Sequence, residues 1–129
     1  MIQGETTMQG LIADDSGVIC TVVNRAFQDL GIQTVHQARD GIDALKFLAA
    51  NDYDIIVTDW NMPGATGLDV TKRARENGTK CPIIMQTTES EKCFVMQAIA
   101  AGVNDYVLKP FTKDEILEKI EMHLGANAT

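Results

Sequence analysis

Residues 54–58, with the sequence Asp-Ile-Ile-Val-Thr, form a short apolar run in the middle of the chain. A strand that has one face in water alternates apolar and polar residues, whereas a strand covered on both faces is apolar throughout. The middle of this run lacks the alternation. It therefore predicts a central strand of a parallel sheet that has helices on both faces.

Four similar runs flank this one, and longer segments with helical spacing separate them. The expected strands are Met8–Ala13, Thr34–Gln37, Asp54–Thr58, Pro82–Gln86 and Asp105–Leu108. Because strand and helix alternate five times, the sequence predicts an α/β domain with a parallel sheet.

Five helical patterns fill the remaining intervals. The first consists of Val18, Ile19, Val22, Val23, Ala26, Phe27 and Leu30, and Gly31 marks its end. The second covers about residues 42–50, and the third, which has the weakest pattern, about residues 68–76. The fourth carries Phe94, Val95, Ala98 and Ile99, and the fifth carries Ile116, Leu117, Ile120 and Leu124. Thr112 and Glu115 predict a capping box at the start of the fifth helix.

The bulk composition limits what the chain can be. Its 129 residues suffice for one domain, and we expect a core over about residues 8–124 with a short tail at each end. The net charge of -7 argues against direct nucleic-acid binding, which depends on Lys and Arg. No apolar run approaches the roughly 20 residues that span a bilayer, and the N-terminal segment lacks a signal-peptide pattern. We therefore expect a cytoplasmic protein without membrane insertion.

The cysteines and histidines suggest no chemistry of their own. Cys20, Cys81 and Cys93 are widely spaced and include no pair of the CxxC type, which is typical of a reduced cytosolic protein. We expect all three to be unreactive packing thiols. His36 and His123 lie near no other motif and are interpreted as surface residues.

The residues that follow the predicted strands form the candidate site. In a parallel α/β sheet, ligands bind outside the carboxyl ends of the strands. Those ends carry Asp14 and Asp15 after the first strand, Asp59 after the third, Thr87 and Thr88 after the fourth, and Lys109 and Pro110 after the fifth. We expect three carboxylates, a hydroxyl and an ammonium to converge at one edge of the sheet.

Three carboxylates in one place require a counter-charge. Mg²⁺ prefers oxygen ligands and typically binds one or two carboxylates together with a phosphate. Lys109 adds a compact charge that suits a phosphoryl oxygen, and a carboxylate in such a setting can attack phosphorus. Taken singly, Asp15 or Ser16 could be a helix N-cap, Asp59 a turn residue and Lys109 a surface lysine. Their coincidence at successive strand ends favours a phosphoryl-accepting site.

Together these residues carry a resemblance to a known family. The matching segments are residues 12–16 (Ile-Ala-Asp-Asp-Ser), residues 56–64 (Ile-Val-Thr-Asp-Trp-Asn-Met-Pro-Gly), Thr87, and residues 106–111 (Tyr-Val-Leu-Lys-Pro-Phe). Over about residues 8–124 the chain resembles the receiver domains of two-component response regulators, above all the CheY-like single-domain regulators of chemotaxis. The resemblance implies a doubly wound, flavodoxin-like (βα)5 fold with the strand order 2-1-3-4-5.

The resemblance also implies a role for each matching residue. Asp59 would accept the phosphoryl group. Mg²⁺, for which Mn²⁺ could substitute, would be held by Asp14, Asp15, Asp59 and the backbone carbonyl of Asn61, with Asp14 acting through water. Lys109 would pair with the phosphoryl oxygens, Thr87 would turn its hydroxyl toward them, and Tyr106 would rotate from exposed to buried. The Lys109–Pro110 peptide bond would be cis.

The function implied is a switch and not an enzyme with a substrate of its own. The partners implied are a CheA-like sensor histidine kinase, a flagellar motor switch protein or another protein target, and a phosphatase. The implied output surface is the fourth helix, fifth strand and fifth helix, and it includes Lys92, Val95, Tyr106 and Lys113. Two alternatives remain open: a phosphorelay intermediate that passes its phosphoryl group to a histidine phosphotransfer protein, and an interaction module that is not phosphorylated.

A few positions are less typical of the family. Thr88 stands where Ala is frequent, and its bulk could restrict the movement of Thr87 and Tyr106. Asn61 and Glu89 lie where family members tune the attack of water on the acyl phosphate. The residues Gln-Gly at 9–10 make the first strand less β-like.

Two functions from other classes fit the sequence less well. A phosphate-cofactor binder such as a flavodoxin would need a loop rich in Gly, Ser or Thr after the first strand, where this chain has Asp14 and Asp15. A phosphatase with an Asp nucleophile would need a general acid two residues beyond Asp59, and Asn61 cannot act as one.

Overall fold

The computed structural model describes residues 8–88 and 92–127, and in these ranges strands and helices alternate throughout. The elements are β1 (Gln9–Ala13), α1 (Gly17–Asp29), β2 (Thr34–Ala38), α2 (Gly41–Ala50), β3 (Ile55–Asp59), α3 (Gly67–Glu76), β4 (Ile83–Thr87), α4 (Lys92–Ala101), β5 (Asp105–Leu108) and α5 (Lys113–Asn127). All strands pair in parallel, in the order β2-β1-β3-β4-β5. The predicted α/β fold and strand order are confirmed.

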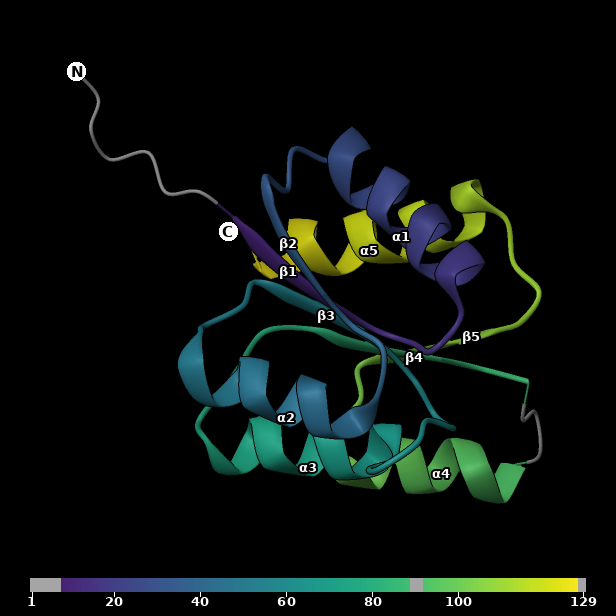
Figure 1. Cartoon of the computed structure of the whole chain (residues 1–129). Helices are drawn as coiled ribbons and strands as arrows, with labels where there is room; N and C mark the ends of the chain where they lie inside the picture. The colour runs from purple at the N-terminus through teal and green to yellow at the C-terminus, as the bar shows by residue number, and fades with distance from the viewer. Residues whose placement is uncertain (1–7, 89–91, 128–129) are drawn as a thin grey trace.

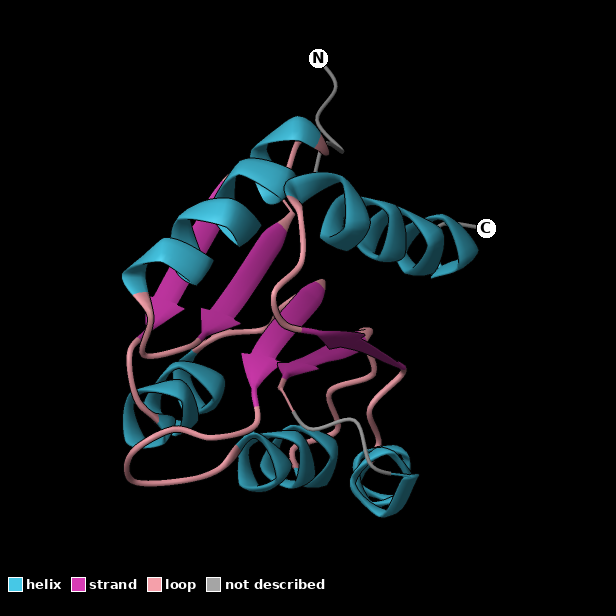
Figure 2. Ribbon diagram, turned by 90° about the vertical axis from the view of Figure 1, so that its right-hand side faces the viewer, coloured by secondary structure: helices cyan, strands magenta, loops and turns pink. Residues whose placement is uncertain are grey.

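The sheet lies between two layers of helices (Figures 1 and 2). Helices α1 and α5 cover one face, and α2, α3 and α4 cover the other (Figure 1). Successive residues of a strand point to opposite faces. Ile55 and Val57 of β3 accordingly belong to the cluster that contains residues of α1 and α5, whereas Ile56 belongs to the other cluster. The double covering explains why residues 54–58 show no polar alternation.

Local signals at the helix ends correspond to the sequence predictions. Ser16, and not Asp15, caps α1, because its Oγ accepts a hydrogen bond from the Ile19 amide at 3.3 Å. Gly31 follows α1 with a positive φ of 79°. The capping box before α5 is confirmed: the Thr112 amide donates to Glu115 Oε1 at 2.8 Å, and the Glu115 amide donates to Thr112 Oγ1 at 3.1 Å.

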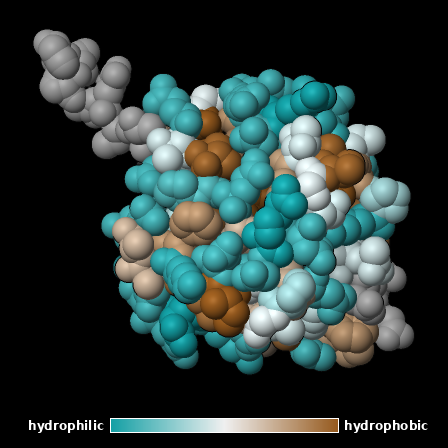
Figure 3. Space-filling model, viewed as in Figure 1, coloured by the Kyte–Doolittle hydropathy of each residue, from teal (hydrophilic) through white to brown (hydrophobic). Residues whose placement is uncertain are grey.

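Two residues that were assigned to apolar helix patterns face solvent. Val18 is 74% exposed and Ile99 is 61% exposed. Val18 precedes the buried Cys20 by two residues, and two residues advance a helix by more than half a turn. Figure 3 shows several separate hydrophobic patches on one face of the otherwise mostly hydrophilic surface.

The expectation that His36 and His123 are surface residues was wrong. His36 is half-buried, stacks on Phe47 with ring centroids 4.9 Å apart, and lies 2.7 Å from the hydroxyl of Tyr53 through Nδ1. His123 is also half-buried, and its Nε2 lies 2.8 Å from a carboxylate oxygen of Asp105. The sequence did not reveal these contacts, because Phe47, Tyr53 and Asp105 all lie in other elements or loops.

The packing expectation holds for two of the three thiols. Cys20 is buried and Cys81 is half-buried, whereas Cys93 is exposed. Burial is the main reason why the pKa of Cys20 is raised and that of Cys81 is raised to about 12, so both remain protonated at neutral pH. These two thiols are therefore poor nucleophiles.

The unusual start of the first strand has a packing explanation. A Cβ atom on Gly10 would lie 2.5 Å from the ring of Phe27, so the absent side chain makes room for the largest buried residue of α1.

Among the helices of the described ranges, none is long and apolar enough to cross a membrane.

Candidate functional site

The candidate site lies at the carboxyl ends of β1, β3 and β5. Strand β1 pairs with β2 on one side and β3 on the other, so the direction of winding reverses between β1 and β3. In open α/β sheets the ligand crevice forms at such a reversal. Asp14 directly follows β1, Asp59 ends β3 and Lys109 directly follows β5.

Three carboxylates meet there. One oxygen from each of Asp14, Asp15 and Asp59 lies within 4.8 Å of the other two. Asp14 is fully buried and Asp59 is 6% exposed, whereas Asp15 faces solvent. The cluster is thus accessible from outside through Asp15 while its floor is formed by buried carboxylates.

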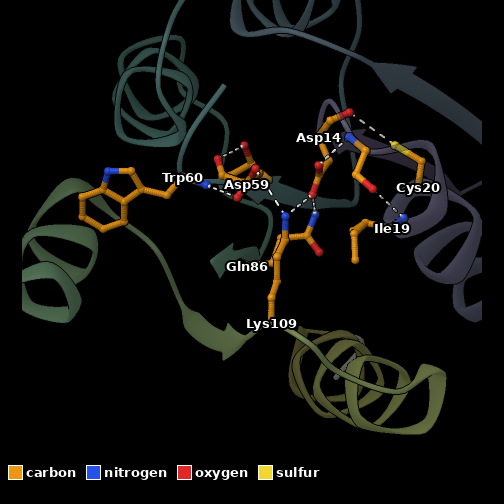
Figure 4. Close-up of polar contacts among 9 residues, drawn as sticks. Asp14, Ile19, Cys20, Asp59, Trp60, Gln86 and Lys109 are labelled. Atoms are coloured by element: carbon orange, nitrogen blue, oxygen red, sulfur yellow. Dashed lines mark hydrogen bonds and ion pairs between the residues drawn. The ribbon is translucent and has the colours of Figure 1, made fainter. Parts of the chain in front are cut away.

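The ammonium of Lys109 bridges the two buried carboxylates (Figure 4). Its Nζ lies 2.8 Å from Asp14 Oδ2 and 3.3 Å from Asp59 Oδ2. Burial lowers the pKa of Lys109, but its contacts with Asp14 and Asp59 outweigh this effect and the pKa is raised overall. The backbone of Lys109 is held by a 2.9 Å hydrogen bond to the Thr87 carbonyl, which fixes β5 against β4.

The two oxygens of Asp59 have different surroundings. Oδ1 accepts a 2.8 Å hydrogen bond from the amide of Trp60, and Oδ2 faces Lys109. Burial and then the charge of Asp14 raise the pKa of Asp59 to about 6, although Lys109 and the Trp60 amide act in the opposite direction. At neutral pH the group is largely ionised, as a nucleophilic carboxylate must be.

Asp14 is held by three donors. The Ser16 amide donates to Oδ1 at 2.8 Å, and the side-chain amide of Gln86 donates to Oδ2 at 2.9 Å, beside Lys109 (Figure 4). Sequence reasoning did not assign Gln86 to the site. The sequence did contain one signal for such a role, because Gln86 is a polar residue at the end of a strand that was expected to be buried.

The remaining predicted residues that the structure describes differ in burial. Thr87 is buried at the end of β4, and Tyr106 is half-buried on β5. Asn61 and Thr88 are exposed, and Glu89 lies outside the described residues. The Lys109–Pro110 peptide bond is cis, as the resemblance implied.

The predicted output surface is only partly open to solvent. Lys92 is exposed on α4 and Val95 is half-buried. Lys113 is engaged in an ion pair with Asp29 of α1 at 2.7 Å. That contact ties the start of α5 to the neighbouring helix.

Trp60 extends the site toward α4. Its indole packs edge-on against the ring of Phe94, with centroids 5.2 Å apart and an angle of 86° between the planes. The residue that holds Asp59 through its backbone therefore contacts a helix of the predicted output surface through its side chain.

The donor set fits Mg²⁺. The three carboxylates carry three negative charges and Lys109 carries one positive charge, so two negative charges remain for a divalent ion to offset. All three side chains offer oxygen, the ligand atom that Mg²⁺ prefers.

Comparison with known proteins gives the same family. The model of the response regulator receiver domain matches residues 11–121. The chain is 42% identical over 123 residues to chemotaxis protein CheY1 of Helicobacter pylori, covering 93% of this chain and 99% of that protein.

Two solved structures extend this similarity to the fold. Vibrio cholerae chemotaxis protein CheY4 has a TM-score of 0.83 at 31% identity, covering 92% of this chain and 99% of that one. The BeF3-activated DrrB receiver domain has a TM-score of 0.84 at 25% identity, covering 93% of this chain and 99% of that one. The chain therefore belongs to the family of response regulator receiver domains.

Proposed function

We propose that a sensor histidine kinase, similar to the chemotaxis kinase CheA, phosphorylates this receiver domain on Asp59. One receiver domain would occupy residues 1–129, with its core over about residues 8–124. The observation that carries the proposal is the ammonium of Lys109, which lies between Asp14 and Asp59 at 2.8 and 3.3 Å in a cluster of three carboxylates. This arrangement places an ammonium beside the proposed acceptor, where it could pair with phosphoryl oxygens.

The transfer forms one bond and breaks one. A carboxylate oxygen of Asp59 attacks phosphorus, the P–N bond of the phosphohistidine breaks, and its electron pair stays on the imidazole nitrogen. The imidazole then takes a proton from solvent. Attack of water on the acyl phosphate later releases inorganic phosphate and restores the Asp59 carboxylate.

The neighbouring side chains would bind and orient the phosphoryl group. Lys109 would turn from the carboxylates toward the phosphoryl oxygens. Asp14, Asp15, Asp59 and the backbone carbonyl of Asn61 would hold Mg²⁺ or Mn²⁺. The metal would supply charge neutralisation for the phosphoryl oxygens.

Phosphorylation would act as a population shift. The phosphoryl group can favour an active state only if Thr87 and Lys109 contact it better in that state. Tyr106 would follow Thr87, and the surface of α4, β5 and α5 would then bind a different set of partners. In this proposal the domain alters only its own phosphorylation and works in the cytoplasm.

The proposed target is a flagellar motor switch protein, because the chain is 42% identical to a chemotaxis protein. A phosphorelay role, with transfer to a histidine phosphotransfer protein, is the alternative. Binding of the activated chain to a motor switch peptide would support the first, and loss of the phosphoryl group to a phosphotransfer domain would support the second. A phosphatase is a further expected partner.

The fluorescence of Trp60 tests the phospho-acceptor role. It is the only tryptophan and its backbone contacts Asp59. We expect saturable changes on titration with Mg²⁺ and again with beryllofluoride, an acyl-phosphate mimic, and loss of the second change in Asp59→Asn. A folded wild-type protein that responds to neither addition would contradict the proposal and would favour an interaction module that is not phosphorylated.

A further inference from the structure

Gln86 combines deep burial with an unsatisfied polar atom. Its side chain is fully buried, and its Oε1 is the only buried side-chain N or O atom without a hydrogen-bond partner in the ranges 8–88 and 92–125. Buried polar groups in proteins are nearly always paired. Ile84, two residues earlier on the same strand, is equally buried and belongs to the apolar cluster on the α1 and α5 side. An apolar residue would therefore suit this face of β4 better than an amide.

The orientation of the amide is fixed by Asp14. A carboxylate can only accept hydrogen bonds, so the Nε2 of Gln86 must face Asp14 Oδ2, and the distance is 2.9 Å. Figure 4 shows this nitrogen beside the ammonium of Lys109, with the amide oxygen directed away from Asp14. Turning the amide over would place its oxygen against the carboxylate. The unsatisfied oxygen is thus the consequence of the hydrogen bond to Asp14.

Gln86 and Lys109 differ in whether they can keep donating to Asp14 when a phosphoryl group is bound. Lys109 divides its ammonium between Asp14 and Asp59, and in the proposed function it turns to the phosphoryl group. The fully buried Asp14 would then lose one of the two donors to Oδ2. The side-chain amide of Gln86 donates to Asp14, and the strand of Gln86 is held on both sides by β3 and β5. Its amide can therefore remain in place when Lys109 leaves.

We propose that Gln86 is a positioning residue, which holds the carboxylate of Asp14 in its metal-binding orientation and leaves Lys109 available for the phosphoryl group. The proposal rests on the proposed function and adds a residue to it. Gln86 does not contact the reacting atoms and acts through Asp14.

Gln86→Met is the direct test, because Met has nearly the same length and no donor. We expect the Kd for Mg²⁺, followed by Trp60 fluorescence, to rise about tenfold or more, as loss of a hydrogen bond to a charged group implies. The Kd for beryllofluoride should rise in parallel. Ile84→Met, at the equally buried position on the same face, should leave both constants within about twofold of the wild type.

Two further measurements separate positioning from a structural role. In EDTA, the unfolding temperature of Gln86→Met should lie no more than about 3 °C below that of the wild type, because the unsatisfied oxygen is removed together with the hydrogen bond. In an Asp14→Asn background, Gln86→Met should change the Kd for Mg²⁺ by less than about twofold, because its target is altered. An unchanged Kd in Gln86→Met, or an equal change in both backgrounds, would overturn the inference.

The wild-type titration shows which proposal has failed. If the wild type responds to Mg²⁺ and beryllofluoride and Gln86→Met responds with the same constants, the role of Gln86 is wrong and the phospho-acceptor function stands. If the wild type responds to neither, the proposed function fails and the role of Gln86 falls with it.

Discussion

The most unusual electrostatic feature at the scale of single residues is the pair of buried carboxylates with one ammonium. Lys109 lies within 3.3 Å of both Asp14 and Asp59, yet the pKa of Asp59 is still raised to about 6 by burial and by the charge of Asp14. One cation therefore does not balance the cluster. In the absence of metal, the charged form of Asp59 lowers the stability of the fold.

Asp59→Asn should therefore stabilise the metal-free protein at neutral pH. The folded pKa of about 6 exceeds the ordinary value of 3.8, so the folded state favours the protonated acid. That contribution is present below about pH 4 and is lost as the pH rises through about 6. In EDTA at pH 7.5, we expect the free energy of unfolding of Asp59→Asn to exceed that of the wild type by on the order of 2 kcal/mol.

Urea unfolding at two pH values checks this expectation. Most of the gain should disappear at pH 4, where Asp59 is protonated in the folded wild type. Glu118→Gln, which alters an exposed acid on α5, should show no comparable gain. A gain of equal size at both pH values would mean that the charge of Asp59 is not the cause.

The sequence predicted which residues of the site lie close together, but not how their side chains contact one another. Asp14, Asp59 and Lys109 end or follow strands, and parallel strands bring such residues to one edge. The contact of Gln86 with Asp14 depends on the side-chain orientation at a position that resembles core. The pairing of His36 with Phe47 and Tyr53 likewise arises only from tertiary packing.

At the scale of elements, the start of α3 is pressed against the end of β3. The Gly67 amide donates to the Trp60 carbonyl at 2.8 Å, and a Cβ atom on Gly67 would lie 2.1 Å from the carbonyl oxygen of Asp59. Backbone, and not a flexible side chain, occupies that space. The helix that begins after the loop therefore fixes the backbone of the proposed acceptor.

Gly67→Ala should destabilise the protein, because either α3 or the end of β3 must move. We expect a loss of about 1–3 kcal/mol in the free energy of unfolding, as overpacking usually causes, and a weaker response of Trp60 to Mg²⁺. The matched change is Gly125→Ala in α5, where a Cβ atom meets nothing within 4 Å. That variant should gain up to about 1 kcal/mol. Urea unfolding measures the stability of both variants. A Gly67→Ala protein as stable as the wild type would contradict this view.

The bounds of elements were predictable wherever the signal is local. The end of α1 at Gly31 and the capping box of Thr112 and Glu115 depend on neighbouring residues, so the sequence shows them directly. The exposure of Val18 and Ile99 was not predictable in this way, because it depends on where another element covers the helix. The weakly patterned third helix begins with a capping box of its own, formed by Thr66 and Asp69.

At the scale of the whole molecule, one sheet serves two apolar layers. Alternate residues of each central strand enter one cluster or the other, so the loss of either helical layer would expose one apolar face of the shared sheet. The strand order came from the family resemblance, because no local signal states which parallel strands are neighbours. The alternation of elements was sufficient to predict the architecture but not this order.

The shared sheet predicts a single cooperative unfolding transition. Trp60 fluorescence reports on the α2, α3 and α4 side, whereas far-UV circular dichroism reports on all helices. We expect the two signals to give the same urea midpoint, within error, for the metal-free protein. Separate midpoints would show that the two helical layers unfold independently.

The bridge between Lys109 and Asp14 joins residues 95 positions apart in the sequence. No short fragment of the chain contains both ends of it, and a chain still emerging from the ribosome lacks the later partner until β5 has been made. Under the proposed function, a copy that is incomplete or locally unfolded would therefore lack a complete acceptor site and would not draw phosphoryl groups away from intact copies. The long separation would then make phosphorylation conditional on a complete fold.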